Sequence, residues 1–563
     1  MEAVEQARSS ISHDSDAGPS EKQEDVSETP LERTQTTDSA YPSNKEVIPV
    51  IAALMLAIFL MALDRTIIAT AIPRITDEFH SLDDIGWYGS AFLLTSAAFQ
   101  LLLGRVYTFY TPKYIFLIII GIFEIGSAIC GAAPNSIAFI FGRAIAGIGA
   151  AGMMTGAVVL LVSVTPLKSR PKWIGLFGAV FGIASVVGPL LGGVFTTDVS
   201  WRWCFYINLP IGAVVIVIVA FLLKPTVPSN KGLTIKQQLA KLDLLGELFL
   251  FPCITCLLLA LQWGGSTYAW SNGRIIALFT LFAALLVAFV LVQIFMQKTA
   301  TVPARIIRSR SILGAMWVTF CIASNMLLVI YYLPIWFQAI QGVSAVQSGI
   351  RTLPLVLAVV VGSIAAGQTV ARVGYYVPLM YLSALLMPIG TGLLLTFEVH
   401  SSEGVWIGYQ ILLGLGIGVG MQQGNMAAQT VLSKQDVPSG VALIMFCQML
   451  GGAIFISVGQ NILDSQLVQR LRTVAPGLTA KQIVNTGATE LRKAVPASQL
   501  DAVLVQYNLA LRQVFLVGVV VSCLTIVGVV VVEWRSVKGK QGPTQKPEQK
   551  KDIEAAAAVE EKV

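Results

Sequence analysis

Apolar runs of about 20 residues recur along most of this chain, from Val47 to Val532. Each run is long enough to cross a hydrocarbon layer roughly 30 Å thick, where a backbone must satisfy its hydrogen bonds within its own helix. Hydrophobic residues make up 55% of the 563 residues and charged residues only 12%, about half the charged share of a soluble domain. The alternation typical of membrane barrels is not seen. We therefore expect an all-α membrane protein with about fourteen transmembrane helices.

The distribution of Lys and Arg predicts how the chain is oriented. Loops after even-numbered spans hold most of the basic residues, for example Arg105, Lys168, Arg170 and Arg308, whereas loops after odd-numbered spans hold few. Basic loops stay in the cytoplasm, so both termini are predicted to be cytoplasmic. The net charge of +6 is explained by this topology, and nucleic acid is not an expected partner.

Three polar segments lie outside the apolar spans. Residues 1–46 and 534–563 are predicted to be disordered cytosolic tails, and residues 1–46 lack the pattern of a cleavable signal peptide. The segment 462–512 is expected to be a long, partly helical loop on the extracellular side.

Five short segments, taken together, carry a family resemblance. Leu63–Pro73 reads LDRTIIATAIP, and Phe141–Ala151 reads FGRAIAGIGAA. Gly188–Gly193 reads GPLLGG and is followed by Trp201–Pro210, WRWCFYINLP, while Gly349–Pro354 reads GIRTLP. In order and spacing these segments resemble the major facilitator superfamily, and specifically its fungal fourteen-span drug:proton antiporter-2 family.

The loop after the second span departs from the superfamily pattern. The superfamily usually has GxxxDRxGRR there, whereas Gly104–Lys113 reads GRVYTFYTPK, with Thr108 in the place of the Asp. A charge relay through this loop is therefore in doubt. Gly104, Arg105 and Lys113 can still orient the turn between the second and third spans.

The resemblance implies the major facilitator fold. Two six-helix bundles, 47–223 and 312–533, would be joined by a linker with two inserted helices, 224–311, and a substrate cavity would lie between the bundles. It also implies proton-coupled export of amphipathic small molecules, such as secondary metabolites, mycotoxins or antifungal drugs, from a fungal cell. Two alternatives remain: uptake or vacuolar transport of amino acids or siderophores, and a nontransporting receptor, scaffold or channel.

The expected partners follow from this reading. They are a small-molecule substrate, protons and the lipid bilayer, and we expect a monomer in the plasma membrane, with the vacuolar membrane as the alternative. Motifs of ATPases and zinc hydrolases are not found, and the only histidines, His13, His80 and His400, lie outside the spans. We expect neither enzymatic activity nor a cofactor or metal.

Ionisable residues inside the spans are the first functional candidates, because charge at membrane depth is costly. Asp64 is our first candidate for the proton carrier, with a permanent structural pair to a neighbouring Arg as the alternative. Glu124 is the second candidate, and its alternative is a buried hydrogen bond between helices. Arg143 would hold a carboxylate or an anionic substrate, or else donate hydrogen bonds to backbone carbonyls.

The remaining candidates concern gating and the cavity. Gly188, Pro189, Gly192 and Gly193 would let the fifth span bend and pack closely, although a purely structural kink would have the same sequence. The polar candidates for the cavity could instead serve ordinary bonding between helices. These candidates are Asn325, Tyr331, Gln422, Gln423 and Asn425.

Overall fold

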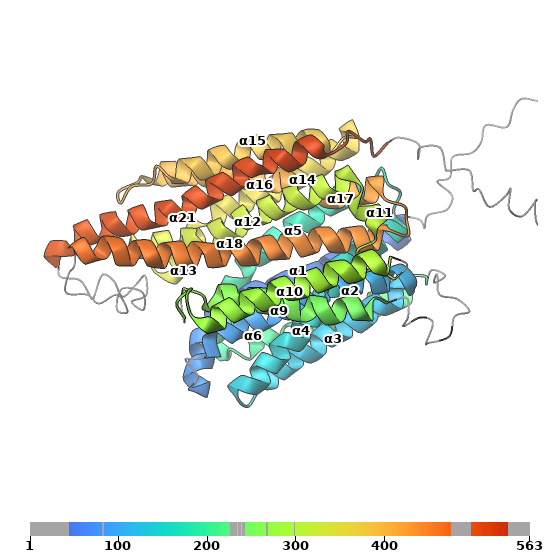
Figure 1. Cartoon of the computed structure of the whole chain (residues 1–563), viewed down its shortest axis with the longest axis horizontal. Coiled ribbons are helices and arrows are strands. Elements are labelled where there is room, and N and C mark those ends of the chain that lie inside the picture. The colour runs from blue at the N-terminus through green and yellow to red at the C-terminus, as the bar shows by residue number, and fades with distance from the viewer. Residues whose placement is uncertain are drawn as a thin grey trace, which may run out of the picture. The chain divides into compact units, whose positions relative to one another are not determined.

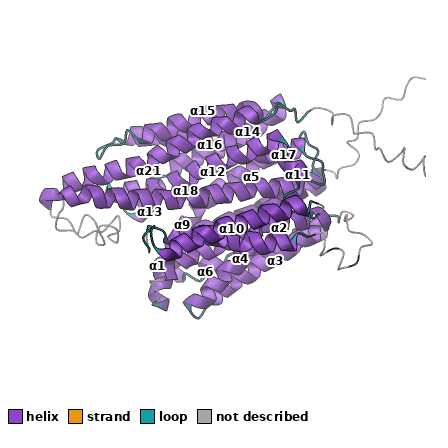
Figure 2. Cartoon of the chain, in the orientation of Figure 1, coloured by secondary structure: helices purple, strands orange, loops and turns teal. Residues whose placement is uncertain are grey.

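Helices make up most of the described part of the computed structural model (Figures 1 and 2). It describes residues 44–80, 84–225, 234, 238, 242–265, 268–297, 299–474 and 497–538. Within these ranges fourteen helical stretches are long and apolar enough to cross a membrane. The expected all-α membrane fold is therefore confirmed. Most of the two predicted tails lies outside the described residues.

The first six spans come from one run of helices that ends near Leu222. The helices are α1 (Asn44–Phe79), α2 (Ile85–Phe109), α3 (Pro112–Ala132), α4 (Ser136–Val164), α5 (Arg170–Val194) with the π-helical turn η3 (Phe195–Val199), α6 (Trp203–Tyr206) and α7 (Asn208–Leu222).

Two further spans lie between the predicted bundles, and six more follow them. The two are α9 (Leu244–Trp263) and α10 (Gly273–Phe295). The later helices are α11 (Ala304–Ile307), α12 (Arg310–Ala339), α13 (Ala345–Arg351), α14 (Leu353–Val373), α15 (Val377–Leu394), α16 (Glu403–Met421), α17 (Gln423–Val431), α18 (Val437–Val474) and α21 (Ala497–Val531).

Local sequence signals set several helix ends. Asn135 caps α4, because its side chain accepts a hydrogen bond from the backbone N–H of Ala138 at 2.9 Å. Pro112 and Pro171 stand in the first turns of α3 and α5, where a missing N–H costs nothing. Gly374 ends α14 with φ of +94°, a left-handed conformation that glycine adopts without strain.

Close contacts between helices rely on small residues rather than on an amphipathic pattern. A Cβ on Gly126 of α3 would lie 2.3 Å from the backbone nitrogen of Ala146 on α4, so only glycine fits there. α3 packs along α4, α12 along α18 and α21, and α14 along α16. Figure 1 shows α12, α14, α15, α16 and α21 gathered in the upper half and α2, α3, α4, α9 and α10 in the lower half.

Two helices continue beyond the spans expected for them. α18 has 38 residues and ends at Val474, and α21 has 35 residues and begins at Ala497. Both ends of the segment 462–512 are thus helical, and residues 475–496 lie outside the described part of the chain.

Candidate functional site

A buried ion pair joins the first and fourth spans. Arg143 Nη1 on α4 lies 2.6 Å from Asp64 Oδ2 on α1, and the two side chains are 1% and 0% exposed. Two charges removed from water are tolerated only when they are well paired. The sequence placed both residues among the candidates, and the structure brings them together.

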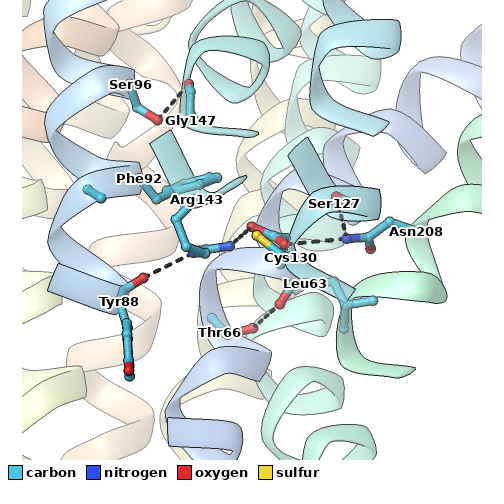
Figure 3. Close-up of polar contacts among 12 residues, drawn as sticks. Leu63, Thr66, Tyr88, Phe92, Ser96, Ser127, Cys130, Arg143, Gly147 and Asn208 are labelled. Atoms are coloured by element: carbon cyan, nitrogen blue, oxygen red, sulfur yellow. Dashed lines mark hydrogen bonds and ion pairs between the residues drawn. The ribbon is translucent and has the colours of Figure 1, made fainter. Parts of the chain in front are cut away.

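Several groups around the pair hold the Arg143 side chain in place (Figure 3). Arg143 Nε donates a hydrogen bond to the backbone oxygen of Tyr88 at 3.0 Å. Its guanidinium lies over the ring of Phe92, 4.5 Å from the centroid, and 5.8 Å from that of Phe205. The guanidinium is therefore fixed by one carboxylate, one carbonyl and two aromatic faces.

Asn208 extends this polar cluster to two more helices. Asn208 Nδ2, at the start of α7, lies 3.3 Å from Asp64 Oδ1 and 3.1 Å from Ser127 Oγ of α3 (Figure 3). Neither residue was a site candidate from the sequence. Asn208 does belong to the quoted WRWCFYINLP segment, which is the signal that could have found it, whereas Ser127 stands in an ordinary apolar span.

Glu124 lies one helical turn before Ser127 on α3. It is buried, and neither carboxyl oxygen has a hydrogen-bond partner among the described residues. Gly212, one turn after Asn208 on α7, leaves the space that this side chain fills, since a Cβ there would lie 1.8 Å from Glu124 Oε1. Burying a carboxyl group without a hydrogen-bond donor is costly. Glu124 is thus a second acidic group beside the Asp64 cluster, in a different bonding state.

The glycines of the GPLLGG segment place α5 directly against α1. A Cβ on Gly188 would lie 2.1 Å from Thr66 Oγ1, and one on Gly192 would lie 2.1 Å from Thr70 Oγ1. Gly193 faces open space, and Pro189 lies inside the helix. Thr66 is two residues from Asp64, so α5 contacts α1 at the same level of the helix but on a different side from the ion pair.

A cavity lies between the helices of the two bundles. Its volume is about 50 Å³, room for a few water molecules rather than a drug-sized ligand. Six methionines from α1, α4, α12, α16 and α18 form much of its wall, and polar side chains complete it. The lining includes Met61, Met154, Met326, Met421, Met445, Met449, Arg65, Gln100, Gln422 and Gln448.

The five predicted cavity residues occupy different places. Gln422 lines the cavity, and its Oε1 accepts a hydrogen bond from Asn425 Nδ2 at 3.0 Å. Gln423 donates to the backbone oxygen of Val419 one turn earlier, at 2.9 Å. Asn325 donates to Thr391 Oγ1 of α15 at 2.8 Å, inside the C-terminal helices. Tyr331 is 50% exposed and packs edge-on against Tyr332.

The bundles meet tightly at the ends that carry the basic loops. At the end of α2, a Cβ on Gly104 would lie 2.3 Å from the Cβ of Ala442 on α18. At the start of α5, a Cβ on Gly175 would lie 2.6 Å from the backbone oxygen of Ser363 on α14. A Cβ on Gly367 would likewise lie 2.5 Å from the backbone oxygen of Pro171. Close packing at these glycines therefore closes this end.

Comparison with known proteins agrees with this architecture. The family model described as Major Facilitator Superfamily matches residues 54–456. The chain is 54% identical over 493 residues to the MFS-type efflux pump MFS1 of Trichophyton rubrum, covering 87% of this chain and 92% of that protein. It is 50% identical over 504 residues to the efflux pump aflT of Aspergillus parasiticus, covering 89% and 98%.

A solved structure shares the fold at low sequence identity. The human organic anion transporter MFSD10 superposes with a TM-score of 0.54 and 14% identity, covering 84% of this chain and 99% of that one. Fold, motifs and relatives agree with the resemblance read from the sequence. This chain is a multi-pass membrane transporter that belongs to the Major Facilitator Superfamily.

Proposed function

We propose that this transporter exports small amphipathic organic molecules in exchange for protons. The observation that carries the coupling proposal is the buried Asp64–Arg143 pair, which a proton can break. The similarity of this chain to proteins named efflux pumps supports export as the direction of transport. Secondary metabolites, mycotoxins or antifungal drugs fit as substrates, because methionine walls adapt to apolar molecules of different shapes.

Protonation of Asp64 would change the forces between α1 and α4. A neutral carboxyl group no longer attracts the guanidinium of Arg143, which then keeps only the Tyr88 carbonyl and the aromatic faces. Asn208 can move with the carboxyl group, because its amide bonds Asp64 and Ser127 at once. The proton thereby alters how α1, α4 and α7 pack together.

The helix α5 can pass this change to the other bundle. Through Gly188 and Gly192 it packs on α1 at Thr66 and Thr70, and through Gly175 and Gly182 it packs on α14. A shift of α1 on protonation is therefore felt where the two bundles meet. Pro189, which lacks an N–H, gives α5 a place to bend within its contact with α1.

Substrate entry requires the bundles to move apart. The cavity accepts only a few water molecules, and the contacts of Gly104, Gly175 and Gly367 close one end. The basic loops at this end favour a cytoplasmic position. The conformation described here is then closed to the cytoplasm, and loading from that side needs rocking of the bundles about the cavity.

Glu124 and the membrane location complete the proposal. Glu124 is the second candidate for the proton carrier, since it is buried beside the cluster without a hydrogen-bond donor among the described residues. We place the protein in the plasma membrane as a monomer, where export removes a substrate from the cell.

Flux measurements with the purified chain test the coupling. Proteoliposomes with an imposed pH gradient should accumulate 6-hydroxy-2-naphthamide, a neutral fluorescent dye, and a protonophore should abolish the accumulation within the same preparation. Accumulation that persists after the gradient collapses would rule out proton antiport. Empty liposomes provide the control for passive dye movement.

A further inference from the structure

Neighbouring residues on α1 face different surroundings. Asp64 lies inside the N-terminal bundle with no exposed surface, whereas Arg65 lines the cavity between the bundles. Successive residues on a helix point about 100° apart, so one residue can serve the ion pair and the next the cavity. The ion pair with Arg143 therefore leaves the charge of Arg65 available for another role.

Among the described residues that line the cavity, Arg65 is the one with a charged side chain. Across the described ranges it forms neither an ion pair nor a hydrogen bond. Half of the other residues in the wall are methionines, and none of the rest carries a negative charge to balance it. A guanidinium in apolar surroundings is costly unless an anion accompanies it. The cavity thus lacks a negative partner that a bound molecule can supply.

Gln100 of α2 supplies an independent polar group in the same cavity. It is 1% exposed, and its Nε2 donates to Thr155 Oγ1 at 2.7 Å. Thr155 holds one end of the amide, while Oε1 has no hydrogen-bond partner in the described part of the chain. A buried carbonyl oxygen without a donor is unfavourable, so this group also favours a ligand that donates a hydrogen bond.

We propose that the cavity selects molecules that combine an acidic oxygen, a hydroxyl or N–H donor and an apolar body. The acidic oxygen, a carboxylate or an ionised phenol, pairs with the guanidinium of Arg65, and the donor bonds Gln100. The apolar body rests on Met154, Met326 and Met445, whose flexible thioethers fit flat and bent shapes alike. This inference names the substrate class and rests on the transport function proposed above.

Binding of two matched fluorescent probes tests the inference. The purified chain in phosphatidylcholine nanodiscs is titrated at pH 7.5 with 6-hydroxy-2-naphthoate and with 6-hydroxy-2-naphthamide, which differ in charge but hardly in shape. We expect the wild type to bind the carboxylate at least about tenfold more tightly. Arg65→Gln should remove this preference, and Arg65→Lys should keep part of it.

Two further variants test whether the position of the side chain in the cavity matters, rather than the total charge of the protein. Arg310→Gln removes an exposed arginine that pairs with Glu533 far from the cavity wall, and it should leave both affinities unchanged. Gln100→Leu should weaken the binding of both hydroxylated probes but not the binding of their 6-methoxy analogues. Equal affinity of the wild type for the two probes would overturn the inference, as would an undiminished preference in Arg65→Gln.

Transport of the same probes keeps this inference separate from the proposed function. If gradient-driven export of the neutral amide persists but the chain binds the carboxylate no more tightly than the amide, the inference fails and the proposed function stands. Where the carboxylate binds preferentially but no probe responds to the gradient, the inference stands and proton coupling fails. Thermal unfolding of each variant in nanodiscs checks that Arg65→Gln is folded, and Arg65→Lys decides the question if it is not.

Discussion

Thr108 Oγ1 on α2 lies 3.2 Å from Ser439 Oγ on α18, and this hydrogen bond connects the two bundles directly. Thr108 is the residue that replaces the acid of the superfamily loop pattern. A hydrogen bond between two hydroxyl groups connects the bundles here, one turn after the close contact between Gly104 and Ala442. Neutral hydroxyls form a weaker contact than ionised groups. Tight packing of the two helices at Gly104 and Ala442 thus accompanies a hydrogen bond between neutral groups.

Gly104→Val should shift the transporter away from the closed conformation. Its Cβ would lie 2.3 Å from that of Ala442, and such overpacking costs about 1–3 kcal/mol. We expect net transport to fall by roughly tenfold. A cysteine introduced at Ser439 should also react faster with an impermeant maleimide in inside-out vesicles.

Gly121→Val is the matched control for this substitution. Gly121 is also a transmembrane glycine, but a Cβ there meets nothing within 4 Å. Its transport and labelling should equal those of the wild type. Unchanged labelling of Ser439→Cys in the Gly104→Val background would contradict a role for this contact in closure. The same variants without the introduced cysteine give the background from native cysteines.

The GPLLGG segment contains its own control for contact between α5 and α1. Gly188→Ala places a methyl group 2.1 Å from Thr66 Oγ1 and should slow gradient-driven transport by at least severalfold. Gly193→Ala enters open space in the same segment and should have no effect. Rates are compared at equal protein content in proteoliposomes. Equal rates for the two variants would remove this contact from the coupling proposed above.

Glu78 predicts a pH-dependent contribution to stability at the end of α1. Its Oε2 accepts from Trp201 Nε1 at 2.6 Å, and its Oε1 lies 2.7 Å from Arg202 Nη2. The Trp201 hydrogen bond, followed by that of Arg202, lowers the pKa of Glu78 below its ordinary value. Because the folded pKa is depressed, the stabilisation is complete above the ordinary pKa of about 4.3 and is lost as the pH falls below it.

Thermal unfolding between pH 7 and pH 3 measures this contribution. Glu78→Gln should lower stability at pH 7 by no more than about 1 kcal/mol, because the side chain is 46% exposed. The difference from the wild type should shrink toward pH 3. Glu403→Gln, whose carboxylate lies 4.0 Å from Arg351 and is well exposed, serves as the control with little expected effect. A constant difference across the pH range would contradict this assignment.

The sequence predicts the spans well because hydropathy depends on composition over a whole helix, and all fourteen are confirmed. It predicts less about which side of a helix faces the cavity. Gln422 and Asn325 are both amides in apolar spans, yet one lines the cavity and the other bonds Thr391. Spans that are apolar all round carry no pattern that fixes their rotation. The roles of Asn208 and Ser127 likewise depend on packing between distant segments.

The cost of charge at membrane depth made Asp64 and Arg143 visible in the sequence, whereas their contact is a property of the fold. The sequence left open whether Asp64 titrates or only pairs with an arginine. The structure brings the pair together at 2.6 Å, so a substitution at Asp64 changes the ion pair as well as any proton transfer. Stability and coupling must therefore be measured separately.

Asp64→Asn should abolish gradient-driven export while retaining downhill exchange of substrate, because the amide keeps the shape but cannot carry the proton. It also leaves Arg143 buried without its negative partner, which should lower stability by about 3–5 kcal/mol. The double variant Asp64→Asn with Arg143→Gln removes both charges and should recover much of that stability but no coupling.

Glu124→Gln should have a smaller effect if Glu124 is structural. Flux under an imposed pH gradient and thermal unfolding are measured on the same samples. Normal gradient dependence in Asp64→Asn would exclude Asp64 as the carrier, and loss of coupling in Glu124→Gln alone would assign the proton to Glu124.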